Sequence, residues 1–274
     1  ISGGSLLGMA GSVYLFVYEN DSWTYKQNFT LGEEAEDEDQ LGESVAISSD
    51  GSTIAFAATH KLYSGWDYGC VYVYTTDDNW SSYSGGLLNR AETLDFGFLG
   101  SSLDINCSGS RIIAGAPLDE TVNCGSVIVF DTNDNWSTFT ETSIQSADYA
   151  EDFGTSVSCS EDGKTLCIGA PCDEDADGNL NTGSAFIYKE VEGSWILQQK
   201  LYHSSQAPEN DFFGSSVALN DDGTQIIGGA PGFADDRGIC SYFELCGTDW
   251  RETMTHQDPT GDIYNEFGDH VAIS

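Results

Sequence analysis

Five oxygen-bearing side chains follow one another at alternate positions around a glycine, Gly178. They are Asp173, Asp175, Asp177, Asn179 and Asn181. Hard oxygen donors at such spacing suit Ca²⁺, which takes about six to eight oxygen ligands. The acid at the twelfth position of an EF-hand loop is replaced here by Ser184. The segment predicts one calcium site, and the alternative is an acidic loop that only carries water.

Catalytic groups are scarce by comparison. The 4 histidines show no metal-ligand spacing, and neither Gly-x-Ser-x-Gly nor His-Glu-x-x-His occurs. The acids are too numerous for one catalytic pair to stand out, so a glycoside hydrolase with two carboxylates is the least favoured function. We expect a non-catalytic protein, without catalytic residues and with Ca²⁺ as the one cofactor considered.

Charge limits the partners of the chain. It carries 45 acidic and 9 basic residues, which gives a net charge of −36. Phosphate binding requires clustered Lys and Arg, so nucleic acid is excluded and an anionic membrane surface is disfavoured. The negative electrostatic field of the chain attracts metal cations, polyamines or basic proteins, although the same charge also keeps a protein soluble. No apolar run reaches the length of a membrane span, so no membrane insertion is expected.

Glycosylation sequons and cysteines indicate the secretory pathway. Asn-x-Ser/Thr triplets begin at Asn20, Asn28, Asn79, Asn106 and Asn135. The 8 cysteines are an even number and include no Cys-x-x-Cys, which favours disulfides over zinc or redox sites. Three pairings are compatible with the predicted strands and loops, and none is preferred: Cys159 with Cys167, Cys240 with Cys246, and Cys124 with Cys172. We expect an extracellular or cell-surface glycoprotein, either a mature product or an excised portion of a longer chain.

One internal repeat organises the whole chain. The stretch FGTSVSCSEDGKTLCIGAP begins at Phe153, and close relatives of it begin at Leu41, Leu99, Phe213 and Phe267. Each unit continues with a glycine-led strand, such as GSAFIY at 183, and then a tryptophan. These tryptophans are Trp23, Trp80, Trp136, Trp195 and Trp250. Self-similarity at a fixed period predicts a repeat architecture.

The units predict four short strands each. In the unit from Phe153, two apolar runs flank the Asp-Gly of a tight turn, and GSAFIY and SWILQQKLY follow as a third and a fourth strand. Helix-period stretches are missing. Four strands in a unit of this length form one blade of a β-propeller. The Phe or Leu would anchor the innermost strand, the glycines would permit close backbone approach, and the Trp would pack between blades.

This pattern resembles the FG-GAP repeat, the blade of integrin-α-type propellers and of many secreted proteins. The resemblance covers essentially the whole chain and implies an extracellular setting with protein or glycan ligands. In integrin propellers the calcium loop joins the first and second strands, whereas the loop from Asp173 joins the second and third. Position nine is Asn181 rather than Asp.

We therefore expect a single all-β propeller domain over residues 1–274. Its units span about 1–40, 41–98, 99–152, 153–212 and 213–266, and 267–274 is an opening strand that closes or continues the ring. Five blade-equivalents follow, one of them split between the termini. A fragment of a larger ring and an open edge that pairs with another molecule are the alternatives.

Strand alternation puts the loops between units on the same face as the loops between second and third strands. Most dense acid is expected on this face, and the sequons before Trp80 and Trp136 on the other. The favoured function is a secreted binding or adhesion module that presents acidic loops, with calcium dependence as an added possibility, to an extracellular protein or glycan. Second is a structural subunit of an extracellular filament that self-assembles through strand edges.

Overall fold

A computed structural model gives the fold of the chain. It describes residues 10–36, 38–63, 66–88, 97–119, 124–146, 148, 150–175, 178–204, 209–260 and 264–274. The described residues are almost wholly β, with one 3-10 turn, η1 (Gly32–Glu34), and one short helix, α1 (Phe233–Asp236). The all-β fold class predicted from the repeat is confirmed.

A two-stranded hairpin precedes four antiparallel sheets of four strands each. The hairpin consists of β1 (Val13–Glu19) and β2 (Ser22–Phe29). Blade 1 is built from β3 (Leu41–Ile47), β4 (Thr53–Ala58), β7 (Cys70–Thr75) and β8 (Ser84–Leu88), with β5 (Leu62–Tyr63) and β6 (Trp66–Asp67) as a small ribbon between β4 and β7. Blade 2 is built from β9 (Leu103–Ile105), β10 (Arg111–Ala116), β11 (Ser126–Asp131) and β12 (Thr140–Gln145).

Blades 3 and 4 follow the same order of strands. Blade 3 is built from β13 (Ser156–Cys159), β14 (Thr165–Ala170), β15 (Ser184–Val191) and β16 (Ser194–Leu201). Blade 4 is built from β17 (Ser216–Leu219), β18 (Gln225–Ala230), β19 (Ile239–Cys246) and β20 (Asp249–Gln257). These are the strands that alternation and the Asp-Gly turns predict, including all four of the unit that begins at Phe153.

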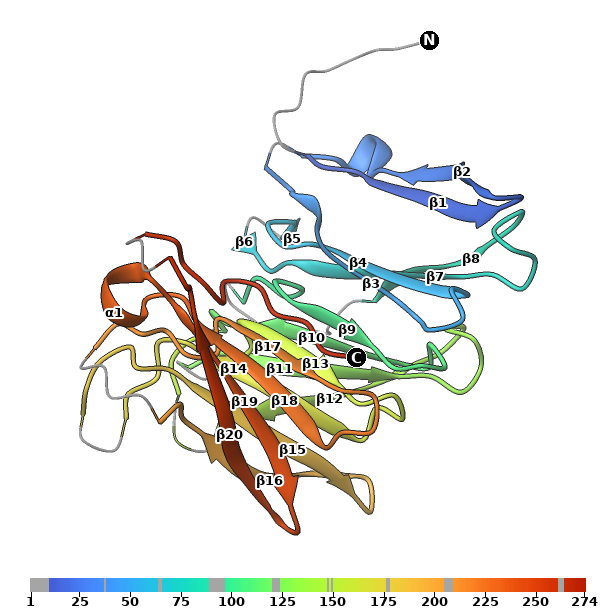
Figure 1. Cartoon of the computed structure of the whole chain (residues 1–274). Coiled ribbons are helices and arrows are strands. Elements are labelled where there is room, and N and C mark those ends of the chain that lie inside the picture. Colours follow the sequence, from blue (N-terminus) through green and yellow to red (C-terminus); the bar gives the residue numbers. More distant parts are fainter. Residues whose placement is uncertain are drawn as a thin grey trace.

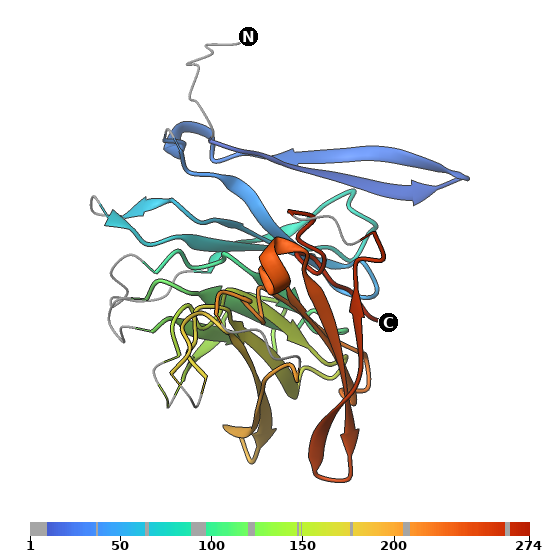
Figure 2. The ribbon, with the colours of Figure 1, turned by 60° about the vertical axis from the view of Figure 1, so that its left-hand side comes forward.

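The sheets follow one another in an arc, as blades of a propeller do. The hairpin β1–β2 lies at one end of the arc and blade 4 at the other (Figure 1). The first strands lie side by side in the order β3, β9, β13 and β17. The segment Phe267–Ser274 continues this inner row, because Gly238 bridges Phe267 and the Val271 amide donates to Ser216 Oγ at 3.0 Å. Figure 2 shows this segment and the hairpin at separate ends of the arc.

Paired glycines explain why the phrases Phe-Gly and Gly-Ala-Pro recur. The Gly154 amide donates to the Gly169 carbonyl of its own blade at 3.0 Å, and Gly154 has a φ of +99°, which disfavours any side chain. A methyl group on Gly115 would overlap the Gly154 carbonyl oxygen of the next unit. Gly169 stands in the same relation to Gly214. The predicted close backbone approach is therefore a contact between the second strand of one unit and the start of the next.

In the units that begin at Leu41, Leu99 and Phe153, a serine two residues after the Leu-Gly or Phe-Gly pair ties the blade to the next unit. Ser102 Oγ donates to the Gly154 carbonyl at 2.9 Å, and Ser156 Oγ donates to the Gly214 carbonyl at 2.8 Å. Ser44 donates in the same way to the Gly100 carbonyl. We call these bonds the serine latches.

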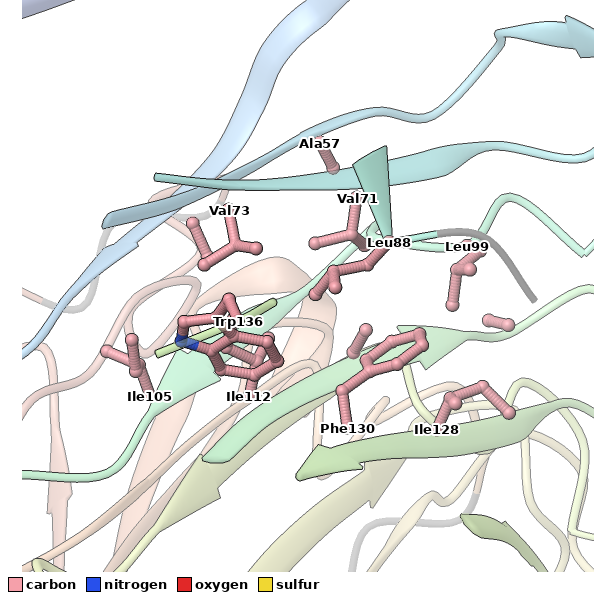
Figure 3. Packing of buried hydrophobic residues seen from close by; sticks show 13 residues of the cluster. Ala57, Val71, Val73, Leu88, Leu99, Ile105, Ile112, Ile128, Phe130 and Trp136 are labelled. Carbon is pink, nitrogen blue, oxygen red and sulfur yellow. The ribbon is translucent and has the colours of Figure 1, made fainter. Parts of the chain in front are cut away.

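Apolar side chains fill each seam between consecutive blades. Figure 3 shows the seam between blades 1 and 2, where Val71, Val73 and Leu88 meet Ile112, Phe130 and Trp136. Phe153 and Phe213, from two of the Phe-Gly pairs, are fully buried. Trp80, Trp136 and Trp250 are 5–7% exposed, as expected for rings between blades, whereas Trp23 is 70% exposed.

The repeat units are thus four complete four-stranded sheets, the hairpin and the segment 267–274. A fifth blade shared between the termini, and closure of the ring, stay predictions. Neither described helix is long and apolar enough to cross a membrane.

Candidate functional site

Loops of blades 3 and 4 on one face of the arc are joined by backbone hydrogen bonds. The Asn210 amide donates to the Leu180 carbonyl at 3.1 Å, and the Phe212 amide donates to the Asn181 carbonyl at 3.0 Å. The Gly232 amide donates to Asp211 at 3.1 Å. The loops between units and the loops between second and third strands therefore share one face, as predicted, and we call it the loop face.

Asp173, the first of the five predicted calcium ligands, is buried and paired inside the fold. Its carboxylate accepts from Ser184 Oγ at 2.5 Å and lies 2.7 Å from Lys200 Nζ. Lys200 also packs over the ring of Phe186, 5.0 Å from its centroid. Burial lowers the pKa of Lys200, but the hydrogen bonds and charges of Asp173 and Tyr202 together outweigh this effect, so the pKa is raised. Asp173 thus holds the base of the loop against blade 3.

The remaining predicted ligands divide into two groups. Asp175 lies at the tip, where its carboxylate accepts from the Asn179 amide at 3.0 Å and from Asn179 Nδ2 at 2.7 Å. Asn181 has a φ of +55° and donates to Asn210 Oδ1, so it serves the joint between loops. Asp177 lies outside the described residues. Among the residues described, no group of three or more His, Cys, Asp or Glu is arranged to hold a metal ion.

The fit of Ca²⁺ is therefore confined to the tip of the loop. Asp175 and Asn179 offer oxygen atoms there, and Asp177 is close in sequence. Asp173 would have to leave Lys200 to contribute. Calcium binding at this loop stays a prediction, with Asp175 as its central residue.

Two more buried acids lie on the loop face, and neither belongs to a motif that the sequence indicates as a site. Asp39 is 3.1 Å from Lys61 Nζ, and Asp211 is 2.9 Å from His203 Nε2. Both acids are at most 1% exposed, and both stand two residues before a Leu-Gly or Phe-Gly pair. This shared position in the repeat is the feature of the sequence that could have identified the two acids. Lys61, like Lys200, is thus paired with a buried acid inside the loop face.

Exposed acid lies at both ends of the blades, which differs from the predicted one-sided distribution. On the loop face the exposed acids are mainly glutamates in loops: Glu33, Glu36, Glu38, Glu151, Glu174, Glu209 and Glu266. On the opposite turn face they are mainly aspartates that cap turns. The pKa of Asp78 is lowered by hydrogen bonds from Ser82, and that of Asp134 by hydrogen bonds from Thr138. The faces differ in how their carboxylates are bound.

The sequons lie mainly at the turns between third and fourth strands. Asn20, Asn79 and Asn135 are exposed at equivalent turns, each with a positive φ of 51–61°. Asn28 is half-buried on β2. Asn106 is 7% exposed, and its side chain accepts from the Arg111 amide at 3.0 Å. Three of the five predicted sites are therefore accessible on the turn face, and Asn106 is engaged in its own turn.

All eight cysteines are free thiols in the structure. Cys159 and Cys167 belong to cores on opposite faces of blade 3, which corrects the possible pairing across their turn. Cys240 and Cys246 lie on one strand, β19, rather than on the two sides of a hairpin. Burial raises the pKa of Cys172 to about 12, with Asp152 adding to the effect.

The inner row of strands lines a pocket of about 350 Å³ at the centre of the arc. Asp104 of β9 lines this pocket, and its carboxylate accepts from the Cys159 amide of blade 3 at 2.7 Å. Burial raises the pKa of Asp104. In the next unit Ser158 plays the same part by accepting from the Leu219 amide at 3.0 Å. These side chains join neighbouring inner strands.

Comparison with known proteins supports the repeat. Residues 145–188, from the end of β12 to β15, match the family described as FG-GAP repeat, which confirms the resemblance seen in the sequence. No curated protein matches the chain. Among solved structures, Kuenenia stuttgartiensis hydrazine synthase has a TM-score of 0.51 and 12% identity. The match covers 84% of this chain and 52% of that chain, so the chain spans about half of that neighbour's length. At this identity the likeness shows the fold alone.

Proposed function

We propose that this FG-GAP repeat scaffold is a secreted, non-catalytic binding module whose loop face takes a basic extracellular protein. One observation carries the proposal: hydrogen bonds join adjacent loops of blades 3 and 4 into one surface that displays exposed glutamates. A surface of one charge on a rigid scaffold concentrates ligands of opposite charge.

The turn face suits solvent and glycans rather than a protein partner. Its aspartates are occupied as caps, and Asn20, Asn79 and Asn135 present sequons there. Attachment of glycan to these turns would leave the loop face open. This arrangement supports an extracellular or cell-surface location. A glycan ligand on the loop face is the second candidate that the FG-GAP resemblance implies.

A basic peptide tests the proposal. Polylysine should bind the native chain and bind a Glu151→Gln, Glu174→Gln, Glu209→Gln variant about 10-fold more weakly, because three loop-face charges are removed. The matched control changes three acids near the turn face, Glu161→Gln, Glu192→Gln and Glu244→Gln. Equal loss of affinity in both variants would show that only net charge matters, and would contradict a loop-face site.

Calcium is proposed as an aid to the same face, held at the tip by Asp175 with Asp177 and Asn179. Calorimetric titration with CaCl₂ should give a binding isotherm for the native chain, and Asp175→Ala should weaken it at least about 10-fold. Asp50→Ala, on the turn face, is the control. Identical isotherms for the native chain and Asp175→Ala would remove this site.

A further inference from the structure

The outer face of the β1–β2 hairpin is a continuous set of exposed aromatic rings. We call it the aromatic face: Tyr14, Phe16, Tyr18, Trp23 and Tyr25. These side chains are 61%, 49%, 58%, 70% and 52% exposed, respectively. Phe16 contacts Tyr25 with ring centroids 5.7 Å apart, and Tyr18 contacts Trp23 at 5.4 Å. A large exposed apolar patch of this kind marks an interaction site.

Residues at the same positions in the other units are covered by the preceding blade. Phe16 corresponds to Phe130, which is fully buried against blade 1, and to Phe243, which is 3% exposed against blade 3. Trp23 corresponds to Trp250, which is 5% exposed in the seam with blade 3. The repeat therefore equips the hairpin for a blade that would precede it in the arc.

A groove beside β1 shows that the inner strand β3 also lacks the covering strand that inner strands of later blades have. Val45 and Ile47 of β3 are 59% and 57% exposed, whereas Val157 and Cys159, at the equivalent positions of blade 3, are 8% and 9% exposed. The groove has a volume of about 380 Å³, and Val13, Leu15 and Phe56 help to line it. In the described chain β1 pairs with β2 alone, so its other edge faces this groove. The hairpin supplies the two outer strands of a blade.

The other end of the arc supplies an inner strand. The segment Phe267–Ser274, called the tail segment, lies beside β17 in the place that β17 takes beside β13. Its residues Val271 to Ser274 repeat the sequence Val45 to Ser48 of β3. His270 is exposed where the earlier units have a latch serine. The two ends of the arc thus offer complementary parts of one blade.

We propose that a second copy of this chain docks head to tail, with its tail segment in the groove and its blade 4 on the aromatic face. The tail would lie along β3 as β3 lies along β9. Blade 4 would cover the hairpin as each blade covers the next. The joint blade then has one inner strand from one copy and two outer strands from the other. Such a heterologous interface builds rings or filaments, according to its rotation.

The proposal commits to a second copy because one docking covers both unpartnered surfaces with the seam chemistry already present. The groove beside β1 is lined by residues between Ser12 and Phe56, so the tail segment of the same copy does not fill it. Copies with a charge of −36 repel one another. Added salt should therefore strengthen association, since the screening length falls to about 8 Å at physiological ionic strength.

Sedimentation velocity over a concentration series in added salt tests the proposal. The native chain should give masses that rise above 29.5 kDa with concentration. Trp23→Ser should weaken association by about 10-fold or more without unfolding the chain, because the ring is exposed in a single copy. Tyr264→Ser, which removes a 72% exposed ring away from the aromatic face, is the control and should associate like the native chain.

A mixing experiment distinguishes this interface from a symmetric one. Ile273→Asp damages the tail segment and leaves the hairpin intact, so it should be monomeric alone. Mixed with Trp23→Ser, it should form a one-to-one dimer and nothing larger, because each variant keeps one working end. Circular dichroism confirms that both variants fold. A native chain that stays monomeric at every concentration overturns the proposal, as does protection of Trp23 from acrylamide quenching in a monomer, which would show closure by the chain's own tail.

Discussion

Phe130 and Phe16 occupy the same position of the repeat and have opposite surroundings. Phe130 is fully buried in the seam between blades 1 and 2 (Figure 3), whereas Phe16 is 49% exposed on the hairpin. Both belong to short, apolar third strands that pair with a fourth strand. The difference teaches that the repeat sets which way a side chain points, while the neighbouring blade decides how much free energy its burial contributes.

Charged contacts also differ between a seam and the hairpin. At the seam between blades 2 and 3, Arg111 binds Asp131 at 2.6 Å and Glu190 at 2.8 Å, and its guanidinium lies 5.2 Å from the Trp195 ring centroid. On the hairpin, Lys26 pairs with Glu19 of the neighbouring strand, 2.9 Å away. In a seam, a single cation can therefore pair with carboxylates of two sheets and hold them together.

The largest expected effect comes from truncation of the two phenylalanines. Phe130→Ala should lower the free energy of unfolding by about 3–5 kcal/mol, because it leaves a cavity in a closed seam. Phe16→Ala should lower it by less than about 1 kcal/mol in the monomer, because only a cross-strand ring contact is lost. Urea unfolding of both variants at low protein concentration measures the difference. Equal losses would show that the aromatic face is already covered in a single chain.

Removal of the seam cation should have the next largest effect. Arg111→Met should lower the free energy of unfolding by about 2–3 kcal/mol, because Asp131 and Glu190 lose a shared partner at a partly buried site. Lys26→Met on the hairpin should leave the melting temperature almost unchanged, since Lys26 pairs with a carboxylate of its own ribbon and joins no second sheet. Thermal melts of the two variants make the comparison, and a larger loss for Lys26→Met would contradict it.

The smallest expected effect is on the stability of the fold at low pH. The hydrogen bond from Arg111 holds the pKa of Glu190 below its ordinary value of 4.5. The pair therefore contributes its full stability above pH 4.5, and this contribution is lost as the pH falls through the lower pKa of the folded state. Glu190→Gln should melt below the native chain at neutral pH and converge with it in acid. A difference that stays constant across this window would show that the charge of Glu190 is irrelevant.

Much of the fold follows from the sequence because the repeat is a physical constraint at each level. Alternation and Asp-Gly turns placed the strands of the unit from Phe153. The paired glycines, such as Gly115 and Gly154, explain the two recurring phrases through a single steric contact. The shared loop face followed from strand alternation alone.

The candidate site was less accessible to sequence reasoning. Spacing identified Asp173 as a metal ligand, but pairing with Lys200 depends on β16, a strand that begins 21 residues later. The sequence indicates only surface charge for the exposed aspartates of the turn face, such as Asp78 and Asp134. The structure shows that they accept hydrogen bonds within their turns. Spacing gives donor types, whereas long-range contacts decide which donors are available.

The serine latches connect the blades one after another along the chain. Ser102 and Ser156 each bond to the unit that follows their own, so these bonds connect consecutive blades. Loss of order should then spread inward from the two ends, as in a row of coupled elements rather than a single cooperative block. Amide hydrogen exchange should accordingly be slowest in β10 and β14, which have a latched neighbour on both sides.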